Sequence, residues 1–136
     1  MTLTLLILDI ESMNVHFSIA GPPCPLIYRE GRCSPLTTQF GWTLGYPFHD
    51  IPFDDQHLQV ERGDVLLFYT DGLSDAGRGV EPEVDRLGSD RLAKMFEDLC
   101  AAGAAKTVDD VFKRVEDYRS GWPLEDDATA LVVTLK

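Results

Sequence analysis

The chain has 136 residues, the size of one domain, and its 44% hydrophobic and 26% charged content is that of a folded globular protein. Its formal net charge of -11 disfavours nucleic acid and anionic membranes as partners, because both require basic patches. Cys24, Cys33 and Cys100 match no zinc or redox motif, so we expect reduced thiols and a cytoplasmic location. The N-terminal apolar run is too short to span a bilayer and lacks the basic flank of a signal peptide.

The first quarter of the chain predicts strands. Residues 3–9 and 13–19 are two apolar segments joined by a polar turn, and in the second segment apolar and polar residues alternate. Alternation predicts a half-buried strand with one face in water. A short apolar piece at 25–28 ends at the turn formed by Glu30 and Gly31, and residues 35–55, rich in Pro, Gly and aromatics, are predicted to be an ordered loop.

Two further strands are predicted in the middle of the chain. Residues 57–61 and 65–69 flank Arg62-Gly63-Asp64, which is a hairpin signal. The run VLLFY at 65–69 shows no alternation, so this strand is expected to be covered on both faces. A polar loop is predicted at 76–88.

Helices are predicted after this loop. Ser89 is expected to cap a helix whose apolar face ends before Gly103, and Thr107 with Asp110 resembles the capping box of a second helix. The apolar faces of the two helices consist of Leu92, Met95, Phe96 and Leu99, and of Val108, Val111, Phe112, Val115 and Tyr118. Residues 128–135 are predicted to return as a strand, so strands precede helices and the fold class is α+β.

Acidic residues flank two of the apolar runs. Asp71 follows the run at 65–69 and precedes Gly72, and Glu125, Asp126 and Asp127 precede the last run. If these strands are antiparallel neighbours, their carboxylates meet at one edge of a sheet. Carboxylate oxygens suit Mg²⁺ or Mn²⁺, and such cations can activate water for phosphoryl hydrolysis. The alternative is that both acidic segments are ordinary turns of an acidic structural domain. Spacing alone leaves both open.

Several segments resemble the SpoIIE/RsbU-type bacterial serine phosphatases, a branch of the metal-dependent PPM (type 2C) family. The most specific is RGDVLLFYTDGLSDAG, at 62–77. The others, in chain order, are AGPPCPLIYREG, GWTLG, LGSDRLAKMF and EDDATALVV. Together they cover essentially the whole chain. The three histidines, His16, His49 and His57, belong to no such motif and are interpreted as ordinary residues.

The resemblance implies a partial αββα sandwich of antiparallel sheets with outer helices. It also implies a site for two Mn²⁺ or Mg²⁺ ions in which Asp71 and Asp126 are metal ligands. Gly72, Asp75 and Asp127 would lie beside the metals or serve as further ligands. A metal-activated water would attack phosphorus directly, with no covalent phosphoenzyme. The implied substrate is phosphoserine or phosphothreonine on a regulatory protein, such as an anti-sigma-factor antagonist in sigma factor regulation.

The chain departs from the family pattern in two places. An earlier Gly-Asp motif, whose Asp bridges both metals in the family, has no counterpart here, because Asp9 aligns with an ordinary turn residue. The His of the family's Ala-Gly-His segment is replaced by Pro22. Residues 1–136 are therefore expected to form a single N-terminally truncated PPM-type domain, its C-terminal portion.

These departures leave competing functions open. One is an active or weakly active phosphatase, and another is a catalytically inactive phosphatase-like interaction module that binds a phosphoprotein. A homodimer formed through exposed sheet edges is a variant of the second.

Overall fold

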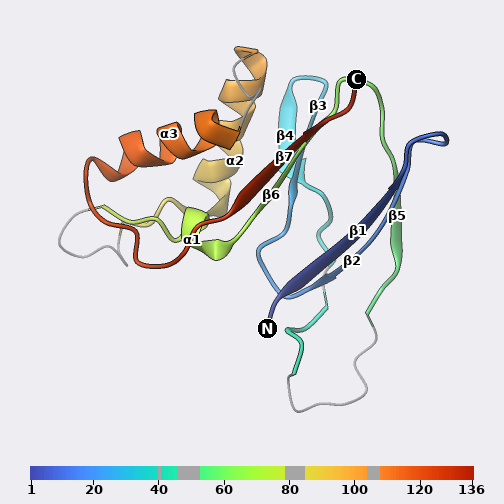
Figure 1. Ribbon diagram of the computed structural model, residues 1–136, viewed down its shortest axis with the longest axis horizontal. Coiled ribbons are helices and arrows are strands. Elements are labelled where there is room, and N and C mark those ends of the chain that lie inside the picture. The colour runs from blue at the N-terminus through green and yellow to red at the C-terminus, as the bar shows by residue number, and fades with distance from the viewer. Residues whose placement is uncertain (40, 46–52, 79–84, 104–107) are drawn as a thin grey trace.

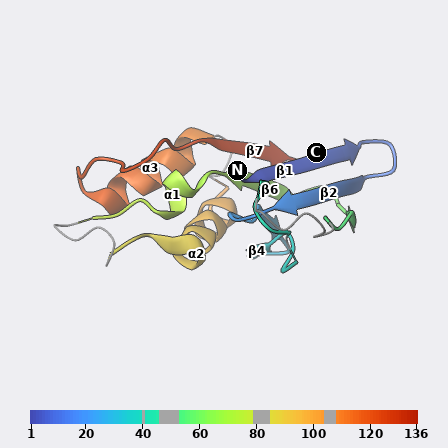
Figure 2. The same cartoon turned by 90° about the horizontal axis from the view of Figure 1, so that it is seen from below.

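Two antiparallel sheets pack face to face in the computed structural model, which describes residues 1–39, 41–45, 53–78, 85–103 and 108–136. Figures 1 and 2 show the layers: helices α2 and α3 lie against one sheet, and the second sheet lies on its opposite face. This α+β arrangement is the predicted fold class. Among the described residues, helices cover one outer face of this sandwich.

Each sheet joins strands that are distant in sequence. The first sheet has the order β1-β2-β5, formed by Leu3–Asp9, Asn14–Ala20 and Gln56–Gln59. The second has the order β4-β3-β6-β7, formed by Arg32–Pro35, Leu26–Arg29, Val65–Tyr69 and Ala130–Thr134. The helices are α1 (Asp71–Ser74), α2 (Gly88–Ala101) and α3 (Val108–Arg119).

Strand β6 lies in the centre of the protein and is covered on both faces, as its unbroken apolar run predicts. Leu67 is fully buried in the cluster that includes Phe96 of α2 and Val115 of α3. Leu66 points the other way, into the cluster between the two sheets, where Phe17 of β2 also packs. One short strand therefore contributes to both cores.

The hairpin predicted around Arg62-Gly63-Asp64 is wrong. Strand β5 pairs with β2 in one sheet, whereas β6 pairs with β3 and β7 in the other. The Asp64 carboxylate is buried and accepts hydrogen bonds from the Arg29 guanidinium, at 2.6 and 3.0 Å, and from the Glu61 amide at 2.8 Å. These bonds stabilise a corner at which the chain passes from one sheet to the other.

Helix boundaries differ from the prediction at the start of α2. The helix begins at Gly88 after Leu87, with no side-chain capping bond, so Ser89 lies in its first turn instead of capping it. The helix ends before Gly103, whose φ of +66° is the left-handed conformation expected of a terminating glycine. The capping box at Thr107 lies outside the described residues.

Parts of the two predicted loops, residues 40, 46–52 and 79–84, lie outside the described residues. An isolated bridge joins Gly77 to Arg86. All three cysteines are free, and burial is the main cause that raises the pKa of Cys33 to about 12 and that of Cys100 to about 11. Thiols with such pKa values are weak nucleophiles at neutral pH.

None of the described helices is long and apolar enough to cross a membrane.

Candidate metal centre

The ends of β6 and β7 bring the two acidic segments together. The strands are antiparallel, with Tyr69 opposite Ala130. Beyond this pair, the Thr70 amide donates to the Thr129 carbonyl at 3.0 Å, and the Thr129 amide donates to Thr70 Oγ1 at 2.9 Å. Thr70 Oγ1 also donates to the Asp127 carbonyl at 3.3 Å. Asp71 and the Asp126–Asp127 pair therefore lie in adjacent segments at one edge of the sheet, as the antiparallel hypothesis requires.

Gly72 allows these segments to approach closely. A Cβ atom at this position would collide with the Asp127 carbonyl oxygen. Gly72 is buried in the short helix α1, which begins directly after β6. The Asp-Gly sequence thus places a carboxylate at the strand end and permits the second acidic segment to pack against it.

The carboxylates at this edge face solvent. Asp71, Asp126 and Asp127 are exposed, and none forms an ion pair with another described residue. Asp71 Oδ1 accepts from the Gly72 amide at 3.1 Å, and Asp126 Oδ1 accepts from the Asp127 amide at 2.7 Å. Each carboxylate therefore keeps an oxygen available to a cation.

Asp75 differs from the other predicted site residues because it already has a cationic partner. Its carboxylate lies 3.4 Å from Arg86 Nη1, and its side chain is about half exposed. A cation bound by Asp75 would have to compete with this ion pair. Among the predicted residues, Asp71 and Asp126 are the better candidates.

Two cavities open beside Asp71. One, of about 360 Å³, is lined by Asp71 together with Gly21, Pro22, Tyr69 and Thr70. The other, of about 580 Å³, is lined by Cys24, Thr37, Asp71, Ser74, Asp75 and Ser89. Both fall in the size range of ligand pockets in proteins.

The donor set fits a hard cation only in part. The two carboxylates offer the oxygen ligands that Mg²⁺ and Mn²⁺ prefer. In the described part of the chain, however, no third His, Cys, Asp or Glu forms a close ligand group with them. Asp9 cannot join, because it lies at the other end of β1, roughly 17 Å along the strand from Thr4, which lines the cavity beside Asp71. Its carboxylate accepts bonds from the turn amides of Glu11 and Ser12, as a turn residue should.

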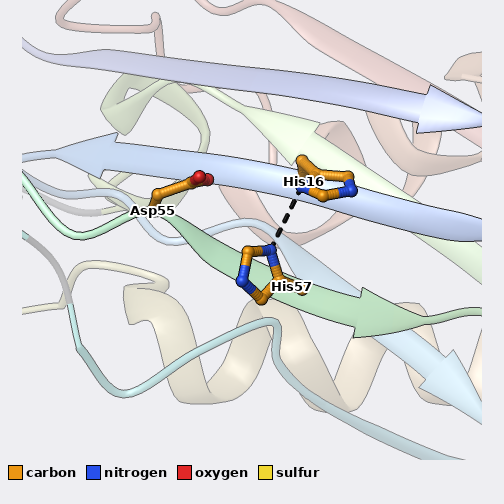
Figure 3. A group of neighbouring side chains, drawn as sticks. All are labelled: His16, Asp55 and His57. Atoms are coloured by element: carbon orange, nitrogen blue, oxygen red, sulfur yellow. Dashed lines mark hydrogen bonds between the residues drawn. The ribbon is translucent and has the colours of Figure 1, made fainter.

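A second group of ligand-type side chains was missed by the sequence interpretation. His16 of β2, His57 of β5 and Asp55, just before β5, lie together on the outer face of the first sheet (Figure 3). Because the two histidines are 41 residues apart, no spacing motif reveals them. The available signal was weak: His16 lies between Val15 and Phe17 in an alternating strand, which indicates a solvent-facing side chain, and His57 has an apolar neighbour only in Leu58.

Comparisons with known proteins agree with this geometry. The family model described as Stage II sporulation protein E (SpoIIE) matches residues 1–136. A search of curated proteins gives no match.

Solved structures share the fold at low sequence identity. The SpoIIE phosphatase domain from Bacillus subtilis, described as presoaked with Mn, has a TM-score of 0.69 and 22% identity; the match covers 98% of this chain and 56% of that one. The SiaA-PP2C domain of Pseudomonas aeruginosa has a TM-score of 0.76 and 19% identity, over 98% and 51% of the two chains. The RsbU and RsbW domains of Rv1364c from Mycobacterium tuberculosis give 0.71 and 23%, over 96% and 35%.

The chain thus spans between about a third and somewhat more than half of these three structures. The family match extends over the whole sequence, and the Asp-Gly turn and the Asp-Asp segment lie where the antiparallel pair β6–β7 brings them together. The protein therefore belongs to the SpoIIE family.

Proposed function

We propose that the Asp71–Asp126 edge binds Mn²⁺ or Mg²⁺ and takes part in metal-dependent hydrolysis of phosphoserine or phosphothreonine on a regulatory protein. The observation that carries this proposal is the β6–β7 register, which places two solvent-facing carboxylates in adjacent segments. Membership of the SpoIIE family supports the same reaction class.

The residues of this chain would have distinct tasks. Asp71 and Asp126 would hold the cations, and Gly72 would keep the Asp127 backbone close to Asp71. Bound cations would supply an activated water and neutralise the phosphate. In the net reaction, water adds across the phosphorus–oxygen bond, and the serine or threonine oxygen leaves as a hydroxyl. The cavities beside Asp71 would admit the phosphorylated side chain.

Charge makes the proposed reaction depend on metal. The chain carries a formal net charge of -11, and the site itself consists of carboxylates, so a phosphate dianion is repelled from it. A bound divalent cation reverses the local sign of the potential. We therefore expect no measurable phosphatase turnover in the presence of a chelator.

The finer features of the function are inferred from the resemblance. We propose that the substrate is a phosphorylated regulatory protein of the anti-sigma-factor antagonist type, and that the protein acts in the cytoplasm.

A homodimer through exposed sheet edges also stays a prediction. A monomeric mass in solution, measured by light scattering across a concentration series, would contradict it.

A second candidate function is a phosphatase-like interaction module without turnover. One observation favours it: no third described His, Cys, Asp or Glu forms a close ligand group with Asp71 and Asp126. Such a module would retain weak Mn²⁺ binding, and it would recognise a phosphoprotein without hydrolysing it.

The test is Mn²⁺-dependent hydrolysis of p-nitrophenyl phosphate and of a phosphoserine peptide. Asp71→Asn should lower kcat by about 100-fold or more, equivalent to about 2.7 kcal/mol. The matched control is Asp9→Asn, which alters another exposed aspartate whose carboxylate accepts backbone amides in a turn. It should leave the rate unchanged. Absence of turnover from folded protein, with Mn²⁺ binding still lost in Asp71→Asn, would favour the interaction module.

A further inference from the structure

A histidine pair lies on the outer face of the β1-β2-β5 sheet, on strands that contribute nothing to the edge at Asp71. His16 of β2 and His57 of β5 are direct partners in the antiparallel register, so their side chains point to the same face. Their Nδ1 atoms lie 3.1 Å apart, and their rings meet edge to face with centroids 4.8 Å apart. Figure 3 shows the two rings converging.

Asp55 completes a three-residue group. It immediately precedes β5, and one ligand atom from each of His16, Asp55 and His57 lies within 4.8 Å of the other two. All three side chains are exposed, and Asp55 forms no ion pair with another described residue. The carboxylate is therefore free to turn toward the imidazoles at little cost.

These donors differ in kind from those at Asp71 and Asp126. Two imidazole nitrogens and one carboxylate suit Zn²⁺ and neighbouring late transition metals, whereas an all-oxygen set suits Mg²⁺ and Mn²⁺. We propose that His16, Asp55 and His57 form a Zn²⁺-binding site on the outer face of the β1-β2-β5 sheet, separate from the carboxylate edge.

The existing geometry is close to what zinc requires. Two ligands bound about 2.1 Å from a tetrahedral zinc lie roughly 3.4 Å apart. The two histidine nitrogens, at 3.1 Å, are already near this separation. The Asp55 carboxylate needs a movement of roughly 1–1.5 Å to reach the same spacing, which rotation of an exposed side chain supplies. Water takes the fourth position, because the group faces solvent.

Zinc at this position would strengthen a weak part of the fold. Strand β5 has four residues, and among the described strands it pairs only with β2, so it is an edge strand held by few backbone bonds. A metal bound to His16 and His57 would join the two strands through their side chains, and Asp55 would fix the segment that enters β5. Because zinc binds the folded arrangement, it should raise the melting temperature.

The test is a Zn²⁺ titration of ¹⁵N-labelled protein that carries Asp71→Asn, which removes one carboxylate from the other candidate site. We expect one bound equivalent, with the imidazole signals of His16 and His57 shifting together and those of His49 unchanged. His16→Gln and His57→Gln should each weaken Zn²⁺ binding at least tenfold in calorimetry. The control is Asp9→Asn, because Asp9 is a carboxylate on the same face of the sheet but lies outside the group. This variant should bind zinc as the parent does.

Several results would overturn the proposal. Zinc affinity unchanged by His57→Gln, or shifts confined to His49 or to the cysteines, would place the metal elsewhere. Because the three side chains are exposed, the glutamine variants should keep the zinc-free melting temperature of the parent. A variant that loses zinc binding and also unfolds earlier without zinc would indicate a structural role for the histidine pair instead. None of these outcomes depends on phosphatase activity.

Discussion

The two sheets differ in how completely the described chain covers them. The central strand β6 of the β4-β3-β6-β7 sheet is covered on both faces, and its residues Leu66 and Leu67 are 1% and 0% exposed. The β1-β2-β5 sheet is buried on its inner face only: Leu5 and Ile7, on the outer face of β1, remain 58% and 63% exposed. Asp71 therefore follows a strand that is covered on both faces, whereas the histidine group lies on a sheet face that is exposed to solvent.

This contrast has a functional meaning. A metal-binding carboxylate must be held in a fixed position, and a strand packed on both faces provides that. An apolar strand face that is open to solvent is typical of a surface that contacts another element or partner. Three variants, in order of decreasing expected effect, test how sharply the two sheets differ.

Truncation of a core leucine should give the largest effect. Leu67→Ala removes a fully buried side chain from the cluster formed with Phe96 and should lower the free energy of unfolding by about 3 kcal/mol. Leu5→Ala makes the same chemical change on the exposed face of β1 and should cost less than about 0.5 kcal/mol. Urea denaturation of both variants measures the difference. Equal losses would mean that the outer face of β1 is as well packed as the core.

Substitution of Gly72 should have an intermediate effect, confined to the carboxylate edge. The added methyl group of Gly72→Ala would collide with the Asp127 carbonyl, and we expect a loss of about 2 kcal/mol, with amide shifts concentrated at residues 126–129. Gly31→Ala is the comparison, because its Cβ meets nothing within 4 Å and only its φ of +85° opposes the change. Shift changes spread evenly over the domain would contradict the close approach.

The corner at Asp64 should give the smallest effect and a characteristic pH dependence. Burial alone would raise the pKa of the Asp64 carboxyl, but hydrogen bonds from Arg29 and from the Glu61 amide lower it below its ordinary value. A lowered folded-state pKa stabilises the protein above the unfolded pKa of about 3.9. This contribution should therefore be complete above about pH 5 and disappear as the pH falls through the folded-state pKa.

Asp64→Asn should reduce stability at pH 7 by about 1–2 kcal/mol, and the difference from the parent should shrink toward low pH. Chemical denaturation at a series of pH values measures both. Asp54→Asn, which changes an exposed aspartate outside this contact, should leave the profile of the parent intact. A constant difference between Asp64→Asn and the parent at every pH would show that the ion pair is not the source.

The sequence predicted features that depend on short-range pattern. The unbroken run at 65–69 indicated a strand covered on both faces, and the structure confirms it, because successive side chains enter different cores. The sequence offered the meeting of the two acidic segments only as a condition on antiparallel neighbouring strands, and the pairing of β6 with β7 meets this condition.

Features that depend on distant partners could not be predicted in this way. Arg62-Gly63-Asp64 has the composition of a hairpin, but Asp64 is instead bound to Arg29, 35 residues away, so the chain turns between sheets. The His16–His57 pair likewise depends on the β2–β5 register. Neither contact can be predicted from the pattern of neighbouring residues in the sequence.

The central claim is that Asp71 and Asp126 share a cation at the end of the packed sheet. Mn²⁺ is paramagnetic, so its binding position can be read from broadening of amide signals in ¹⁵N-labelled protein, with no need for turnover. We predict that the Gly72 and Asp127 amides broaden first, that Asp71→Asn abolishes this, and that Asp9→Asn does not. Broadening spread over the acidic surface, or unchanged in Asp71→Asn, would contradict the account.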